Sequence, residues 1–207
     1  MSKRLNALAS LVDTNNVFDV GCDHGLLSIM LSDTHNVVAS DITPSSVNIA
    51  KKNIKEANVN VEVIQSDGLD KLDIEKDDTI ILAGMGTYTI MKILKNNIDK
   101  VSNTLIIQAN NNLDILRRNI VKLGYYIDSE ITLYENRWYT LIRFKKGHVK
   151  YRKIDYILGP NPNIDYIKFN LDIYKKMYNK IPNRYFIKKL NTYLIIKTIE
   201  RKLHNLM

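Results

Sequence analysis

The 207-residue sequence has little cysteine, proline or glycine: one Cys, four Pro and eight Gly. The single Cys22 excludes a disulfide framework and a cysteine zinc site, and it is typical of a reducing cytoplasm. No apolar run approaches the roughly 18 residues that a membrane span needs. Residues 5–12 lack a small-residue cleavage site, so we interpret them as a helix rather than a signal peptide. We therefore expect a cytoplasmic protein without a metal site or a membrane partner.

The net charge of +8 is unevenly distributed. Residues 1–145 contain 16 Lys/Arg and 18 Asp/Glu, whereas residues 146–207 contain 14 and 4, together with seven of the 12 tyrosines. This contrast favours a small-molecule domain, residues 1–145, joined to a basic polyanion-binding domain, residues 146–207. A solvated, lysine-rich helical face explains the charge of the tail equally well.

Short apolar runs alternate with helical patterns along the first 145 residues. We expect helices at residues 25–31, 44–58, 90–98 and 113–123, between strands at residues 17–20, 37–40, 61–64, 79–83 and 104–107. Residues 125–134 and 138–144 are expected to form a closing antiparallel pair. This order predicts an α/β fold with a parallel, doubly wound, Rossmann-like sheet.

The tail is expected to form two helices. Apolar residues recur at three- and four-residue steps from Ile164 to Tyr178, and Pro182 then breaks the pattern and can open a second helix. The residues expected to face inward in that helix are Tyr185, Leu190, Leu194, Ile199 and Leu203. Such a hairpin would either bind RNA phosphates or mediate dimerisation. The lysines expected to contact RNA are Lys175, Lys176, Lys188 and Lys189.

Polar residues and glycines follow the predicted strands directly. Ligands of doubly wound sheets bind at the carboxyl ends of the strands, so these residues are expected to meet. Each of them, taken singly, also fits a turn, a helix cap or a structural hydrogen bond, but their coincidence at successive strand ends favours a nucleoside site. They are Asp19, Gly21, Cys22, Asp23 and His24, then Asp41 and Ile42, then Ser66, Asp67 and Gly68, then Gly84, Met85 and Gly86, and finally Asn110.

The charge of the first loop distinguishes among nucleoside cofactors. The dinucleotide fingerprint G-x-G-x-x-G is not met, because Asp23 and Leu26 stand at its second and third glycine positions. Asp19 and Asp23 would repel a pyrophosphate, whereas a sulfonium is positively charged. The residues therefore favour S-adenosylmethionine (SAM), with Asp41 accepting the ribose hydroxyls and Asp67 within reach of the adenine amine.

Several motifs carry a more specific resemblance. They are Arg4-Leu5, Asp19-Val20-Gly21-Cys22-Asp23-His24-Gly25, Ser66-Asp67-Gly68-Leu69, Ala83-Gly84-Met85-Gly86, Gln108-Ala109-Asn110, Leu116-Arg117 and Trp138-Tyr139. With these motifs the chain resembles the bacterial tRNA (adenine-22-N1)-methyltransferase family over about residues 2–145. The resemblance implies a SAM-dependent domain followed by a helical, coiled-coil-like domain. It also implies methylation of adenine N1 in tRNA, release of S-adenosylhomocysteine, and tRNA contacts for Arg4, Arg117 and Tyr139.

Four positions depart from the family pattern. Thr87 stands in place of a glycine, Ala109 in place of a proline, and Asp41 and Thr140 each in place of a glutamate. Asp41 keeps the carboxylate. The other three differences bear on the pocket for the target base.

The chemistry of adenine N1 limits what the protein has to supply. N1 carries an in-plane lone pair, so positioning rather than a strong base provides most of the rate. We expect Asp23 to stabilise the charge that develops on the adenine and Asn110 to read its Watson–Crick edge. Two alternatives are a SAM enzyme acting on another RNA, a small molecule or a protein, with an oligomerising tail, and a nucleoside-binding module without catalysis. We expect a monomer, with a dimer through the C-terminal helices as the alternative.

Overall fold

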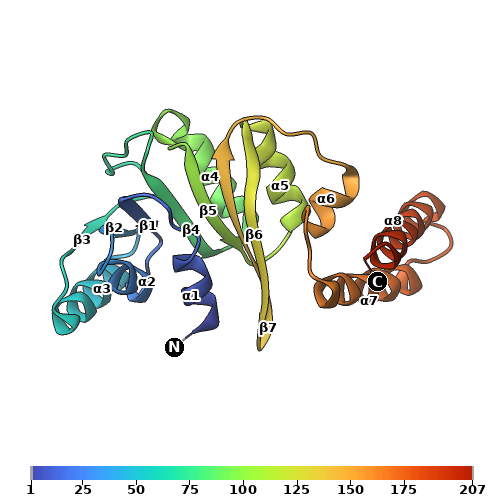
Figure 1. The fold of residues 1–207 in the computed structure, drawn as a ribbon, viewed down its shortest axis with the longest axis horizontal. Coiled ribbons are helices and arrows are strands. Elements are labelled where there is room, and N and C mark those ends of the chain that lie inside the picture. The colour runs from blue at the N-terminus through green and yellow to red at the C-terminus, as the bar shows by residue number, and fades with distance from the viewer. Residues whose placement is uncertain (1, 207) are drawn as a thin grey trace. The chain divides into compact units, whose positions relative to one another are not determined.

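The structure is a computed structural model that describes residues 2–206 (Figure 1). The chain divides into two compact units, Met1–Val149 and Lys150–Met207, which we call the N-terminal and C-terminal units. The boundary expected after residue 145 falls inside the last strand of the N-terminal unit, β7 (Arg137–Lys146). The function assigned to each unit stays a prediction.

A seven-stranded sheet forms the N-terminal unit, with the strand order β3-β2-β1-β4-β5-β7-β6. β7 pairs antiparallel with β5 and with β6. The five parallel strands and β6 are β1 (Asn16–Val20), β2 (Asn36–Asp41), β3 (Val61–Gln65), β4 (Thr79–Met85), β5 (Thr104–Ala109) and β6 (Tyr125–Glu135). The strand order reverses at β1, which lies between β2 and β4, so the predicted doubly wound, Rossmann-like fold is confirmed.

Helices pack against both faces of this sheet. Side chains of β1 alternate between two apolar clusters, with Val17 in one and Phe18 in the other. The Val17 cluster includes residues of α1 (Lys3–Ala9) and α2 (Leu26–Leu31). The Phe18 cluster includes residues of α4 (Thr87–Asn96) and α5 (Leu113–Lys122).

The remaining helices of this unit show how local sequence sets helix ends. Helix α3 (Pro44–Ala57) begins after Thr43, whose side chain accepts a hydrogen bond from the Ser46 N–H, and it ends at Asn58 in the left-handed conformation. Helix α4 begins three residues before the predicted position because Gly86 is its N-cap. Ile98 lies in a separate 3₁₀ turn, Ile98–Lys100, rather than in α4.

In its described residues, 150–206, the C-terminal unit contains three helices: α6 (Lys153–Leu158), α7 (Ile164–Lys180) and α8 (Phe186–His204). α7 packs against α8, so the predicted helical hairpin is present. The small core of this unit is formed by Ile154, Ile157, Leu158, Ile167 and Ile199. Helix α6 was not predicted, although Asp155 supplies a capping signal by accepting a hydrogen bond from the Arg152 backbone N–H.

The inward face predicted for the second tail helix is wrong over its first half. Helix α8 begins at Phe186, and Pro182 lies in the preceding turn, where its carbonyl accepts from the Tyr185 N–H. Ile199 is buried and Leu203 packs on the core, as predicted. The residues predicted to be buried that are exposed instead are Tyr185, Leu190 and Leu194. α8 carries apolar side chains on several faces, so their spacing alone does not select the packed face.

Within residues 2–206, none of the helices combines the length and apolar character required to span a bilayer.

Candidate active site

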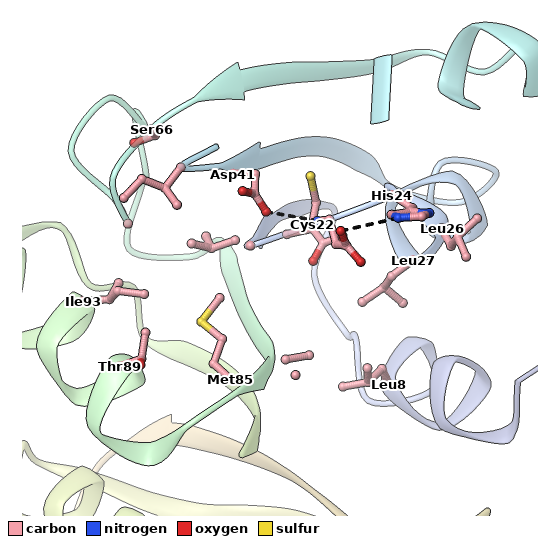
Figure 2. A pocket seen from close by; sticks show the side chains of 18 of the residues that line it. Leu8, Cys22, His24, Leu26, Leu27, Asp41, Ser66, Met85, Thr89 and Ile93 are labelled. Carbon is pink, nitrogen blue, oxygen red and sulfur yellow. Dashed lines mark hydrogen bonds and ion pairs between the residues drawn. The ribbon is translucent and has the colours of Figure 1, made fainter. Parts of the chain in front are cut away.

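A cavity of about 730 Å³ opens at the carboxyl ends of β1, β2, β3 and β4 (Figure 2). This volume lies in the range of roughly 300–1,000 Å³ that is typical of small-molecule sites. Helix α1 contributes Arg4 and Leu8 to the wall, and α4 contributes Thr89 and Ile93. Every cofactor-binding residue predicted from the sequence lines the cavity except Gly86. The structure thus brings these residues together, and their contact with a cofactor stays a prediction.

The loop after β1 turns sharply beneath the cavity. Gly21 has a φ of +76°, in the left-handed region, and a Cβ at this position would collide with the Met85 methyl group. The backbone N–H groups of Gly21 and Cys22 both donate to the Ser40 carbonyl, at 2.8 and 2.9 Å. These bonds join the loop to β2, because Ser40 belongs to that strand.

Asp41 lies at the end of β2 and connects two loops of the cavity wall. Its Oδ2 accepts from the Asp23 N–H at 3.2 Å, and its Oδ1 accepts from the Thr43 N–H at 3.0 Å and the Thr43 hydroxyl at 3.2 Å. A carboxylate offers about four acceptor sites, so capacity for a ribose hydroxyl is left. Asp41 therefore has the turn role that its position suggested, and its contact with a ribose stays a prediction.

Asp19 is a buried carboxyl group in the cavity wall. Burial raises its pKa to about 6, although the Ser28 hydroxyl donates to it at 2.6 Å and Arg4 lies close enough to lower the value. A positively charged ligand beside Asp19 would favour its ionised form. This arrangement suits a sulfonium better than a phosphate.

Cys22 and Asp23 sit side by side in the same loop with different exposure. Burial, followed by the charge of Asp19, raises the pKa of the Cys22 thiol to about 12, so it is a neutral group rather than a nucleophile. The Asp23 side chain is 75% exposed, and its Oδ1 lies 3.7 Å from His24 Nε2. Asp23 is thus accessible to a substrate that approaches the cavity from solvent.

The ends of β4 and β5 are linked through Gly84 and Asn110. Gly84 has a φ of +80° and lies at a bulge between Ala83 and Met85. Its N–H donates to Gln108 Oε1 at 3.2 Å, and its carbonyl accepts from Asn110 Nδ2 at 2.6 Å. The Asn110 side chain is therefore bonded to the rim of the cavity.

Two arginines approach the ring of Tyr139 beside this link. The guanidinium carbon of Arg4 lies 5.7 Å from the ring centroid and that of Arg137 lies 4.7 Å from it. Arg4 also donates to Gln108 Oε1 at 3.1 Å, and Arg137 donates to Asn110 Oδ1 at 3.2 Å. Sequence reasoning missed Arg137, because only the pairing of β6 with β7 brings it to the site.

Known methyltransferases are similar to this chain in sequence. Residues 1–142 match the family model described as a methyltransferase domain. The tRNA (adenine(22)-N(1))-methyltransferase of Bacillus subtilis is 30% identical over 144 residues, which cover 66% of this chain and 60% of that enzyme. A proposed tRNA methyltransferase of Mycoplasma pneumoniae is 32% identical over 145 residues, 66% of this chain and 67% of that protein. The chain therefore belongs to the methyltransferase family that this model describes.

A solved structure extends the similarity beyond the matched domain. TrmK of M. capricolum, in complex with S-adenosyl-homocysteine, has a TM-score of 0.85 and 29% identity, over 99% of this chain and 98% of that one. The resemblance to the tRNA (adenine-22-N1)-methyltransferase family is confirmed.

The predicted contact of Arg117 with tRNA is wrong. Arg117 is fully buried, and its guanidinium forms two hydrogen bonds with Glu130, Nη2 to Oε1 at 2.7 Å and Nε to Oε2 at 3.0 Å. A side chain without solvent exposure cannot contact RNA in the folded protein. The arginine of the Leu116-Arg117 motif therefore joins α5 to β6.

Three of the four departures from the family pattern lie away from the cavity wall, and the fourth, Asp41, lines it. Thr87 is fully buried, and its hydroxyl donates to the Asn111 carbonyl at 2.6 Å, which joins the start of α4 to the loop before α5. Ala109 and Thr140 are also buried. None of the three lines the cavity.

The four tail lysines predicted to bind RNA differ in their surroundings. Lys175 pairs with Glu200 at 3.1 Å, and Lys176 pairs with Asp172 at 2.6 Å. Lys189 donates to Asn183 Oδ1 at 2.7 Å, whereas Lys188 is exposed. Their contact with RNA stays a prediction.

Proposed function

We propose that this chain transfers the methyl group of SAM to N1 of an adenine in cytoplasmic tRNA, at position 22 as in the name of the Bacillus subtilis relative. The observation that carries the proposal is the carboxylate-lined cavity at the strand ends of a chain that belongs to this methyltransferase family. Its volume suits a nucleoside-sized ligand, and Asp19 and Asp41 suit a cofactor that has a positive sulfonium and ribose hydroxyls.

Different residues of the cavity bind different parts of SAM. Asp41 binds a ribose hydroxyl, and Asp67, which follows β3, accepts from the adenine amine. Gly21 adopts the left-handed conformation that turns the loop along the cavity wall, and the Met85 methyl group packs against it where a Cβ would lie. Asp19 becomes ionised beside the sulfonium and stabilises it. Within residues 2–206, no cluster of three or more His, Cys, Asp or Glu side chains is arranged to hold a metal ion.

The bound cofactor supplies an electrophilic methyl group. The N1 lone pair of adenine forms the new C–N bond while the C–S bond breaks, and the bonding electrons go to sulfur. The adenine gains the positive charge that the sulfonium loses, so no proton has to leave first. Asp23 lies at the exposed side of the cavity and would stabilise the new charge.

Asp23→Ala should therefore lower kcat much more than tRNA affinity, because the charge that Asp23 stabilises arises only during transfer. Single-turnover kinetics and filter binding measure the two quantities. An equal loss of both would make Asp23 a binding residue.

The C-terminal unit is proposed to bind tRNA by neutralising phosphates. Residues 146–207 contain 14 Lys/Arg against 4 Asp/Glu, and three of those acids, Asp155, Asp172 and Glu200, already form ion pairs within the unit. The remaining cations provide the basic surface. The alternative is dimerisation, and the exposed Phe186 and Ile187 on α8 favour it. Sedimentation of the free protein and of its tRNA complex distinguishes a monomer from a dimer.

Mass spectrometry of nucleosides tests the function directly. Unmodified tRNA is incubated with SAM and the protein, and the digested nucleosides are compared with a 1-methyladenosine standard. We expect 1-methyladenosine at one position, mapped by the stop that it causes in reverse transcription. Asp41→Ala serves as the control for dependence on the cavity. Methylation of another atom, or of protein alone, would contradict the proposal.

A further inference from the structure

The orientation of the Gln108 amide is fixed by its partners. An amide orientation is ambiguous only when its partners can both donate and accept. Gln108 Oε1 receives hydrogen bonds from the Gly84 backbone N–H at 3.2 Å and from Arg4 Nη1 at 3.1 Å. Both partners can only donate. The oxygen of Gln108 therefore faces them, and its NH₂ group faces Asn110.

The orientation of Asn110 follows from the same logic. Its Oδ1 accepts from Gln108 Nε2 at 3.1 Å and from Arg137 Nη2 at 3.2 Å. Its Nδ2 donates to the Gly84 carbonyl, which can only accept, at 2.6 Å. Both lone pairs of the oxygen and one of the two N–H bonds are thus engaged. The exposed side chain has a single N–H left to offer a substrate.

This remaining capacity limits what Asn110 can read on an adenine. The Watson–Crick edge presents the N6 amine, a donor, and N1, which must face the methyl group. Asn110 has no acceptor left for the amine, so the expectation that it reads this edge does not fit its hydrogen bonds. The acceptors that remain on the base are N3 and N7.

The end of the β6–β7 hairpin holds the donors of this network in place. Glu135 accepts from the Ser2 hydroxyl at 2.9 Å and from the backbone N–H groups of Lys3 and Arg4 at 2.8 and 3.4 Å. The first of these backbone bonds, followed by the Ser2 bond, lowers the pKa of Glu135, so it stays ionised. One turn of the hairpin therefore presents Arg137 and also fixes the helix that carries Arg4.

We propose that Asn110 is a specificity-determining residue that donates one hydrogen bond to N7 or N3 of the target adenine. Gln108 and Arg137 are positioning residues that keep its amide in the donating orientation. This inference rests on the proposed function and adds to it the atom by which the base is recognised. A purine base is selected through an acceptor on its ring, at a distance from the nitrogen that is methylated.

Substrate analogues that lack one ring nitrogen test this proposal. The target adenosine of a full-length tRNA is replaced by 7-deazaadenosine or by 3-deazaadenosine, both of which keep N1 and the amine. We expect one of the two to lower kcat/KM of the natural enzyme by roughly 3- to 10-fold, the value of one net hydrogen bond. The same analogue should have no such effect on Asn110→Ala. Comparing the two enzymes cancels any change in the nucleophilicity of N1.

Two further variants separate donation from structure. Asn110→Asp keeps the shape but has no N–H, so it should lose discrimination against the analogue as Asn110→Ala does. Arg137→Met should also reduce discrimination, because the Asn110 oxygen loses a donor that holds it. Lys122→Met is the matched control, since Lys122 is the last residue of α5 and Asn110 precedes the start of that helix. SAM affinity, measured by calorimetry, should be unchanged in all of them and reports that they are folded.

The outcomes are distinct. Equal sensitivity of the natural enzyme and Asn110→Ala to both analogues would overturn the inference, as would full discrimination by Asn110→Asp. Failure of the proposed function would instead appear as absence of 1-methyladenosine from natural tRNA.

Discussion

The two units of this chain differ in how charge and apolar surface are distributed. The N-terminal unit covers both faces of its sheet and has Asp19 and Asp41 at strand ends, where they line the cavity. The C-terminal unit has a small core and leaves large apolar side chains exposed on α8, among many lysines. Topology thus builds the cavity at the strand ends, whereas amino-acid composition gives the tail its basic charge.

The largest expected difference between the units concerns ion pairs. Glu130→Ala leaves Arg117 charged and buried in the N-terminal unit, so it should lower the free energy of unfolding by about 3–5 kcal/mol. Asp172→Ala breaks the exposed pair with Lys176 in the C-terminal unit and should cost about 0–1 kcal/mol. Urea denaturation measures both. Equal losses of unfolding free energy in the two variants would contradict this difference between the units.

The second expected effect is the cost of a buried carboxyl group at the site. The folded pKa of Asp19, about 6, lies above its ordinary value of 3.8, so the folded state binds this proton more tightly. Ionised Asp19 therefore destabilises the protein above pH 6, by up to about 3 kcal/mol, and this cost declines as the pH falls from 6 towards 4.

Asp19→Asn should accordingly be more stable than the natural protein at pH 7.5, and the difference should shrink below pH 6. Denaturation curves at several pH values give the difference, and the exposed Asp33→Asn is the control. A difference that does not depend on pH would show that Asp19 is not perturbed by burial.

The third expected effect is a loss of SAM affinity without a loss of tRNA affinity. Asp41→Ala should weaken SAM binding by ~1.5–3 kcal/mol, because the variant has no charged acceptor for a ribose hydroxyl. Its tRNA affinity should be unchanged. Calorimetry with SAM and filter binding with tRNA test the two statements, and unchanged SAM affinity in the folded variant would exclude Asp41 from the site.

The smallest effect compares lysines within the C-terminal unit. Reversing Lys188 and Lys189 to Glu should flatten the salt dependence of tRNA binding by about one unit of log–log slope for each phosphate that is no longer neutralised. Reversing Lys175 and Lys176 should change it less, because those lysines already pair with Glu200 and Asp172. Identical slopes for the two double variants would argue against a localised RNA surface.

The sequence predicted the N-terminal unit better than the tail for a physical reason. Buried parallel strands are short apolar runs, and Thr43-Pro44 marks a helix start, so both signals are local. The cavity residues could be predicted in the same way, because they come directly after the predicted strands. Arg137 reaches Asn110 and Glu135 reaches Ser2 only through long-range pairing of the hairpin, and the burial of Arg117 depends on Glu130 across α5 and β6. No local pattern encodes these contacts.

The most direct test of the division between the two units is to measure SAM and tRNA affinity of a protein that ends at residue 149 beside those of the full chain. The N-terminal unit has its own core and contains every residue that lines the cavity. We expect unchanged SAM affinity and a large loss of tRNA affinity and of kcat/KM for tRNA. Methylation of tRNA at the full-length rate by the shortened protein would contradict the account.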